Sequence, residues 1–365
     1  MKEYRVGIVG ATGMVGQRFV SLLKDHPWFR VTCVAASARS AGKSYREAVG
    51  ARWAFDWPIP DTVADLTVID ASDIDAVAEK VDFVFCAVDM KKDEVRALEE
   101  SYAKHEIPVV SNNSACRGLE DVPMVVPEIN AAHLEVIETQ RRRLGTRRGF
   151  IAVKPNCSIQ SYVPALTPLL DFEPKEVMVC TYQAISGAGK TFATWPEMVD
   201  NVIPYIGGED EKSEQEPLKL WGRVEETERG RVIVNAKEPV ISAQCLRVAC
   251  SDGHMAAVSV RFGRKVTREQ ILDRWAHYET EAQRLELPNA PKPFLQYFED
   301  PTRPQTRLDR DFQGGFGVSI GRLREDRIMD WRFVCLSHNT IRGAAGGGIL
   351  TAELLCRKGY IEPQA

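Results

Sequence analysis

Short apolar runs alternate with amphipathic stretches along the first half of the chain. Four of these runs have the length and character of buried parallel strands: residues 4–9, 30–36, 81–88 and 107–110. Helix-like stretches follow at residues 17–24 and 94–104, and in the second of them Val95, Leu98 and Tyr102 share one face. Strands that alternate with helices in this way predict a parallel sheet, with ligands at the carboxyl ends of its strands.

The pattern changes after residue 157. Pro164 and Pro168 interrupt the next helix-like stretch, so we expect a shorter or bent helix there. A strand is expected at residues 176–182. Further short runs, such as 232–234 and 256–260, predict a second, largely antiparallel sheet. Together with the length of 365 residues, which exceeds the usual size of one core, this change predicts two domains.

Composition narrows the class of protein. Hydrophobic residues make up 44% and charged residues 27%, which is typical of a globular protein, and the net charge of −4 argues against a nucleic-acid binder. The arginine-rich stretch at residues 141–148 is interpreted as a solvated turn. Nine scattered cysteines without metal-ligand spacing favour a reducing cytoplasm and no metal. No apolar stretch approaches ~20 residues, so we expect neither an export signal nor a membrane span.

A glycine-rich turn follows the first apolar run. Gly10, Gly13 and Gly16 are spaced Gly-x-x-Gly-x-x-Gly between the expected strand and the expected helix. Gly10 permits a tight turn, Gly13 lets the backbone approach a pyrophosphate, and the free N–H groups at the helix start attract its charge. The spacing departs from the commonest dinucleotide fingerprint, so it predicts a Rossmann-like domain and leaves its subclass open.

The end of the second expected strand indicates which nicotinamide cofactor is bound. NAD-binding proteins place an acidic residue there, where it holds the ribose 2′-hydroxyl. This chain instead has the hydroxyls of Ser37 and Ser40 and the cations of Arg39 and Lys43. These groups suit a 2′-phosphate, and no carboxylate repels it. We therefore predict NADP(H) in preference to NAD(H); the alternative is a basic loop at the sheet edge.

Cys157 is the candidate nucleophile. It follows the apolar run at residues 150–153 and the sequence Lys154-Pro155-Asn156, and it precedes a helix-like stretch. At a helix start, N–H groups and the helix dipole lower the pKa of a thiol, and Asn156 is placed to hydrogen-bond an oxygen that gains negative charge. The alternative is inert packing, because free cysteines are among the most buried residues.

Three other residues carry candidate chemistry. His254 lies just before an expected strand and is the natural partner for Cys157, because Cys/His pairs distant in sequence commonly meet in space. The guanidinium of Arg247 suits a substrate carboxylate. Arg117 ends a polar loop, residues 111–117, that suits phosphate or another anion. The alternatives are a structural histidine and simple turn chemistry.

Seven motifs, in this order, resemble the aspartate-semialdehyde dehydrogenase family, nearest to its archaeal and fungal branch. They are GIVGATGMVG at residues 7–16, SNNS at 111–114, VPE at 126–128, PNCS at 155–158, YQAISGAG at 182–189, GH at 253–254 and NTIRGAAG at 339–346. The chain departs from the family in having Ile159 in place of threonine after Asn-Cys-Ser, and Ala249 in place of proline after Arg-Val. Neither departure removes a group that performs chemistry.

The resemblance implies roles for the site residues. It implies that Cys157 is the nucleophile, His254 the acid/base and Gln183 a residue that positions the substrate in the active site. The substrate and phosphate site is expected to comprise Arg247, Glu209, Lys212, Arg117 and Asn113. Asp210 or Glu211 are the alternatives to Glu209. The cofactor is expected to contact Gly10, Thr12, Gly13, Met14, Val15, Ser37, Arg39, Ser40, Lys43, Ala87, Ser186, Gly187 and Asn339.

The resemblance also implies an organisation and a reaction. An α/β chain is expected, with a Rossmann-like parallel-sheet domain at residues 1–155 plus 339–365. An α+β catalytic and dimerisation domain with a mixed or largely antiparallel sheet is expected at 156–338. The implied reaction is NADP-dependent reductive dephosphorylation of 4-phospho-aspartate to aspartate semialdehyde, releasing phosphate, on the route to lysine, threonine and methionine. A homodimer or homotetramer is expected. A malonyl-CoA reductase on the same scaffold and a non-catalytic NADP-binding protein are the alternatives.

Overall fold

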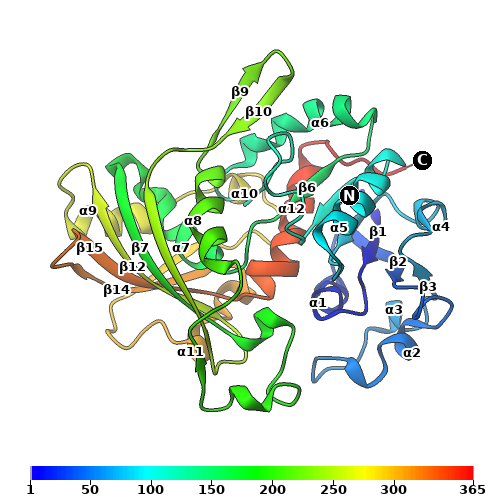
Figure 1. The fold of residues 1–365 in the computed structure, drawn as a ribbon, viewed down its shortest axis with the longest axis horizontal. Helices are drawn as coiled ribbons and strands as arrows, with labels where there is room; N and C mark the ends of the chain where they lie inside the picture. The colour runs from blue at the N-terminus through cyan, green and yellow to red at the C-terminus, as the bar shows by residue number, and fades with distance from the viewer. Residues whose placement is uncertain (1, 365) are drawn as a thin grey trace.

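The computed structural model describes residues 2–364 and contains two large sheets with helices packed around them (Figure 1). The first sheet is built from the N-terminal part of the chain, and the second from its central and C-terminal parts. Both chain ends lie on the side of the first sheet (Figure 1). Within residues 2–364, every helix is too short or too polar to cross a membrane.

The first sheet has six strands, all parallel, in the order β3-β2-β1-β4-β5-β6. Its strands are β1 (Tyr4–Val9), β2 (Phe29–Ala36), β3 (Val68–Asp70), β4 (Phe83–Cys86), β5 (Val109–Ser111) and β6 (Ile151–Val153). The predicted parallel sheet is therefore confirmed. Strand order reverses between β1 and β4, and such a reversal opens a ligand-binding crevice at the carboxyl ends of the strands.

The helices of this part are short, and most connect successive strands. They are α1 (Met14–Leu22), α2 (Tyr45–Val49), α3 (Asp61–Ala64), α4 (Ile74–Ala78), α5 (Lys92–Lys104) and α6 (Ile137–Leu144). In α5, Val95 and Tyr102 are buried and Leu98 packs against the same core, as the apolar spacing predicts.

The second sheet has seven strands in the order β13-β14-β15-β12-β7-β11-β8. Its strands are β7 (Pro174–Gln183), β8 (Val202–Ile203), β11 (Val240–Val248), β12 (His254–Phe262), β13 (Leu295–Phe298), β14 (Val318–Glu325) and β15 (Trp331–Ser337). The β7–β11 and β13–β14 pairs are parallel, and the other pairings are antiparallel. The sheet is therefore mixed and largely antiparallel, as expected.

One run expected in the second sheet lies elsewhere. Residues 232–234 belong to β10 (Gly230–Val234), which pairs only with β9 (Arg223–Thr227) in a separate hairpin. This part of the prediction is wrong. Alternation of apolar residues shows that a strand exists but not which strand it pairs with, and the Ile233 N–H instead bonds the Glu120 carbonyl oxygen of the first half of the chain.

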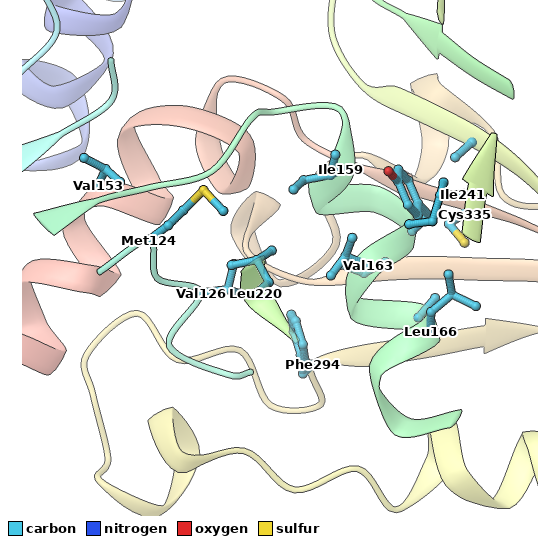
Figure 2. Close-up of a cluster of buried hydrophobic side chains, with 14 of the residues drawn as sticks. Met124, Val126, Val153, Ile159, Val163, Leu166, Leu220, Ile241, Phe294 and Cys335 are labelled. Atoms are coloured by element: carbon cyan, nitrogen blue, oxygen red, sulfur yellow. The ribbon is translucent and has the colours of Figure 1, made fainter. Parts of the chain in front are cut away.

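Helix α7 (Ile159–Leu166) occupies the middle of the larger core (Figure 2). It packs against β12, β14 and β15, and its Ile159, Val163 and Leu166 side chains are buried there. Pro164 lies inside α7, and a 3₁₀ turn with Pro168 at its start follows immediately, so the α-helix is short, as predicted. The remaining helices are α8 (Glu209–Leu220), α9 (Arg268–Ala276), α10 (Glu281–Arg284), α11 (Thr306–Asp309) and α12 (Gly346–Arg357).

The C-terminal segment returns to the first sheet and is held by a buried ion pair. Helix α12 packs against β5 and α1. Just before it, the Arg342 guanidinium donates from Nη1 and Nη2 to the two carboxylate oxygens of Glu128, both at 2.7 Å. Both side chains are almost wholly buried. The exact domain division, at residues 1–155 with 339–365 and 156–338, stays a prediction.

Candidate active site

Cys157 lies in the turn between β6 and α7, two residues before the helix begins. Its side chain keeps partial access to solvent. Gly343 covers it from the C-terminal segment, because a β-carbon added at Gly343 would lie 2.9 Å from Cys157 Cβ. The Glu128–Arg342 ion pair fixes the residue before this glycine. The fold therefore brings three distant segments together around the thiol.

The electrostatic surroundings of Cys157 differ from the sequence-based expectation. Burial raises the pKa of the thiol above its ordinary value, and the Glu209 carboxylate raises it further. Lys154, Arg117 and Arg247 act in the opposite direction without cancelling these effects. The expected lowering of the pKa at the helix start is wrong, because burial and the Glu209 carboxylate disfavour the thiolate more than the neighbouring cations favour it.

His254 is the first residue of β12, and its side chain is wholly buried. Its Nδ1 accepts a hydrogen bond from the Ala184 N–H at 3.1 Å, whereas its Nε2 has no partner in the part of the chain that the structure describes. Burial, reinforced by the Arg247 cation, lowers the pKa of His254 to about 3. The imidazole is therefore neutral at neutral pH, and because Nδ1 accepts a hydrogen bond, the ring proton lies on the unpartnered Nε2.

Arg247 and Gly187 form the wall next to this nitrogen. Arg247 lies on β11, is buried, and donates from Nη1 to the Ala184 carbonyl oxygen at 2.8 Å. A β-carbon at Gly187 would lie 2.8 Å from Arg247 Nη1 and 2.9 Å from His254 Nε2. Glycine is needed here because any side chain would press against both groups.

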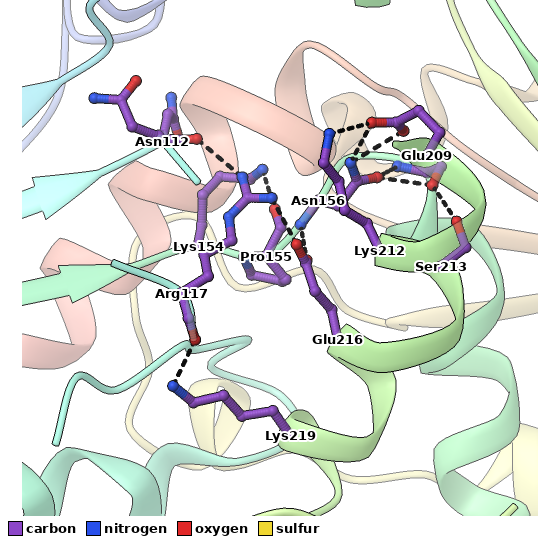
Figure 3. Close-up of polar contacts among 12 residues, drawn as sticks. Asn112, Arg117, Lys154, Pro155, Asn156, Glu209, Lys212, Ser213, Glu216 and Lys219 are labelled. Carbon is purple, nitrogen blue, oxygen red and sulfur yellow. Dashed lines mark hydrogen bonds and ion pairs between the residues drawn. The ribbon is translucent and has the colours of Figure 1, made fainter. Parts of the chain in front are cut away.

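A second cluster gathers around Glu209, the first residue of α8 (Figure 3). Its carboxylate accepts from Lys212 Nζ at 2.8 Å, from Asn156 Nδ2 at 3.0 Å and from Gln183 Nε2 at 3.3 Å. Burial favours a higher pKa for Glu209, but Lys212, Asn156 and Gln183 hold the pKa below its usual value. Four residues predicted for the site are thus in direct contact, and Glu209 itself makes the contacts that its neighbours Asp210 and Glu211 do not.

Arg117 approaches the same region from the loop after β5. Its Nη1 donates to Glu216 of α8 at 2.9 Å, and its Nη2 donates to the Asn112 carbonyl oxygen at 3.0 Å (Figure 3). Asn113, predicted to hold phosphate, donates from its amide to Glu99 at 2.9 Å and to the Cys86 sulfur at 3.4 Å. Its side chain is therefore committed to the core beneath the loop, and its role at phosphate stays a prediction.

The glycine turn after β1 has the form that a dinucleotide requires. Gly10 has a φ of +88°, and a β-carbon there would lie 2.3 Å from the Ala87 carbonyl oxygen. Gly13 caps α1 without a side-chain hydrogen bond, which leaves the first N–H groups of the helix free of a side-chain cap. Thr12, Met14 and Val15 belong to the same turn and helix start.

A cleft of about 440 Å³ joins this turn to the second sheet. Met14 lines it on one side and Ser186 on the other. Asn339 borders the same region: its Nδ2 donates to Ser186 Oγ at 2.9 Å, and its Oδ1 accepts from the Gly253 N–H at 2.8 Å. The structure therefore brings Met14, Ser186 and Asn339, from distant parts of the chain, to one crevice, and the cofactor roles of the predicted residues stay predictions.

The loop after β2 carries the residues predicted for the 2′-phosphate. Ser40 is nearly buried, and its N–H bonds the Ser37 carbonyl oxygen at 2.8 Å. Arg39 and Lys43 are exposed, and neither forms an ion pair with any residue from 2 to 364. Two unpaired cations at the end of β2 fit a 2′-phosphate.

Three residues of the site were not singled out from the sequence. Lys154 lies within the quoted cysteine motif, Glu216 follows Lys212 by one helical turn on α8, and Gly343 lies in the C-terminal motif. The spacing of four residues between Lys212 and Glu216 was the available signal for a shared helix face. Neither Lys154 nor Gly343 could be recognised as a site residue from the sequence, because a lysine before a proline and a glycine among glycines are common in loops.

Comparison with known proteins gives matches over nearly the whole chain. Family models described as the semialdehyde dehydrogenase NAD binding domain and dimerisation domain match residues 5–137 and 166–342. Aspartate-semialdehyde dehydrogenase of Archaeoglobus fulgidus is 42% identical over 98% of this chain and 100% of its own length, and that of Saccharomyces cerevisiae is 40% identical over 97% and 98%. The crystal structure of the Candida albicans enzyme with NADP is 38% identical and has a TM-score of 0.88, covering 99% of this chain and 100% of that one.

Proposed function

The chain belongs to the aspartate-semialdehyde dehydrogenase family, and from this premise we propose that it reduces 4-phospho-L-aspartate to L-aspartate 4-semialdehyde with NADPH and releases phosphate. The reaction is reversible and serves the biosynthesis of lysine, threonine and methionine. The observation that carries the proposal is the convergence of Cys157, the free Nε2 of the neutral His254 and the Arg247 guanidinium, whose charge acts on the pKa of both other groups.

In the proposed mechanism His254 takes the thiol proton of Cys157 on Nε2. This requires the tautomer with the ring proton on Nδ1, and so the release of the hydrogen bond that the Ala184 N–H donates to Nδ1. The thiolate attacks the acyl carbon, a C–S bond forms, and the C–O bond to phosphate breaks as phosphate leaves with the electron pair. When bound, NADPH supplies a hydride to the thioester carbon. The C–S bond then breaks, the aldehyde leaves, and the Cys157 thiolate forms again.

Other residues bind and orient the substrate. Arg247 suits the α-carboxylate because its guanidinium has no carboxylate partner in residues 2–364. Asn156 and the Cys157 N–H are the donors for the oxyanion, a type of contact worth about 3 kcal/mol per donor. The Asn156 amide now bonds Glu209, so it must be shared with the substrate oxygen. Arg117 and Lys212 are cations that we assign to the departing phosphate.

The fold carries a fitting cofactor site. The uncapped start of α1 suits the pyrophosphate, and the exposed Arg39 and Lys43 suit the 2′-phosphate. Ser186 and Asn339 lie where the crevice approaches the catalytic residues. This supports NADP(H) as the cofactor.

We further propose a homodimer formed through the outer face of the second sheet. Met178 and Tyr182 of β7 and Val240 of β11 are large apolar side chains that are 53%, 38% and 67% exposed. A sheet face of this kind is normally covered by a partner. The dimerisation-domain model matches this part of the chain. Light scattering on the purified protein distinguishes a dimer from a tetramer or monomer.

The test of the reaction is absorbance of reduced nicotinamide with aspartate semialdehyde, NADP⁺ and phosphate, repeated without phosphate and with NAD⁺. NADPH formation that depends on phosphate supports the proposal. Absence of NADPH formation, together with NADPH oxidation in the presence of malonyl-CoA, would replace it with the malonyl-CoA reductase alternative. No NADPH turnover with either substrate, by a folded protein that binds NADP, would favour a non-catalytic role.

A further inference from the structure

Lys154 is a buried lysine next to the nucleophile that the mechanism above does not use. Only 3% of its surface is exposed, and its Nζ donates to the Pro155 carbonyl oxygen. In residues 2–364 no carboxylate lies within ion-pair distance of it. A buried ammonium without an ion-pair partner is destabilising, and buried ionisable groups of this kind cluster at functional sites.

Close to Lys154, the Glu216 carboxylate is held by one cation and one backbone N–H group. Glu216 accepts from Arg117 Nη1 at 2.9 Å through one oxygen and from the Asn156 N–H at 2.6 Å through the other (Figure 3). Arg117 Nε is buried and has no partner within residues 2–364. The Lys212–Glu209 pair nearby is balanced in charge.

The cations around Glu216 outnumber its single carboxylate by one. When Lys154 is protonated, it and Arg117 carry two positive charges against the single negative charge of Glu216, and both cations act on the pKa of Cys157. Burial, reinforced by Arg117, lowers the pKa of Lys154 to about 7. A dianion that enters next to Lys154 would favour its protonated form and meet the excess charge.

Resting on the proposed function, we propose that Lys154 is a phosphate-binding residue: its ammonium and the Arg117 guanidinium together hold the phosphoryl group that departs when Cys157 attacks the acyl carbon. The Glu216 carboxylate lies between Arg117 and the Asn156 N–H, in the position proposed for the anion. Phosphate displaces it. Phosphate bound by both cations then gives the buried Lys154 a partner for its charge.

Lys154→Met tests this, because methionine keeps the length and apolar stem of lysine without the charge. In the phosphate-dependent oxidation of aspartate semialdehyde, we expect the KM for phosphate to rise at least about tenfold, while the KM values for aspartate semialdehyde and NADP⁺ stay within about twofold. Lys92→Met, which removes one exposed lysine of α5, is the control and should leave all three values unchanged. An unchanged phosphate KM in an active Lys154→Met protein would overturn the proposal.

A second readout does not depend on turnover. Inorganic phosphate should raise the unfolding temperature of the wild-type protein, and Lys154→Met should lose most of this shift while its own unfolding temperature without phosphate stays equal or rises. If the wild type gives no NADPH but retains a phosphate shift that requires Lys154, the proposed reaction fails and the phosphate site stands. If the variant changes only the alkylation pH profile of Cys157, and both phosphate readouts stay as in the wild type, Lys154 tunes the thiol and the proposal is wrong.

Discussion

Gly187→Ala places one methyl group between the two groups that handle the substrate. The added β-carbon would lie 2.8 Å from Arg247 Nη1 and 2.9 Å from His254 Nε2, where ordinary van der Waals contact begins at 3.4 Å. The end of Arg247 can swing aside, but His254 is wholly buried and its Nδ1 is held by the Ala184 N–H. The imidazole or the loop must therefore move by about 0.5 Å, the difference between 3.4 and 2.9 Å.

Such a displacement affects catalysis and leaves folding intact. Proton transfer by a positioned side chain contributes about 10²–10⁴-fold, and a misplacement of about 1 Å costs about 10²-fold. For half that distance we expect kcat to fall about 10- to 100-fold. Gly187 is exposed and its φ lies outside the left-handed region, so alanine is tolerated by the backbone.

The assay is steady-state NADPH formation together with thermal unfolding. Gly118→Ala is the matched control, because Gly118 is also exposed, also lacks a left-handed φ, and has open space where its β-carbon would lie. We expect both variants to unfold near the wild-type temperature and only Gly187→Ala to lose activity. A Gly187→Ala protein with kcat within twofold of the wild type would refute the placement of His254 Nε2 beside this glycine.

Three other results follow from the same contacts. Glu128→Gln should lower the free energy of unfolding in urea by about 3–5 kcal/mol, because it leaves the buried Arg342 cation uncompensated, and a loss below 1 kcal/mol would contradict this. Replacing both Arg39 and Lys43 by alanine should raise the KM for NADP⁺ about tenfold or more and leave that for NAD⁺ within about twofold; equal changes would show that the loop does not bind the 2′-phosphate. The folded-state pKa of His254, about 3, lies below its unfolded value of about 6.5, so its stabilising effect is complete above pH 6.5 and is lost as the pH falls toward 3. Urea unfolding should therefore show a loss of about 2 kcal/mol between pH 6.5 and 5 that is absent in His254→Gln, and identical slopes in both proteins would argue against a buried neutral imidazole.

The sequence predicted the parallel sheet because its strands are buried on both faces and read as continuous apolar runs. It could not place residues 232–234, since pairing partners depend on distant segments such as the Glu120 backbone. The position of Cys157 before a helix was also predictable from the local pattern. The direction of its pKa shift was not, because that depends on how much the rest of the fold buries the thiol and on the approach of Glu209 from α8.

In the active site, too, the local sequence predicts some features, and others depend on distant segments. Motifs identified the residue types, and the family resemblance joined them in one site. The sequence does not reveal that the Asn113 amide donates a hydrogen bond to Glu99 or that Glu216 accepts one from Arg117. Both are outcomes of packing between segments far apart in the chain. Lys154 could be recognised as unusual only once its burial was known.

Intact-protein mass spectrometry after mixing the enzyme with aspartate semialdehyde and NADP⁺, with phosphate withheld, tests the central claim most directly. Without the acceptor for the acyl group, the thioester should accumulate as one aspartyl group per chain on the peptide that contains Cys157, alongside one equivalent of NADPH. The adduct should disappear on addition of phosphate and be absent in Cys157→Ala. NADPH formation without an adduct on Cys157, or full turnover by Cys157→Ala, would contradict the account.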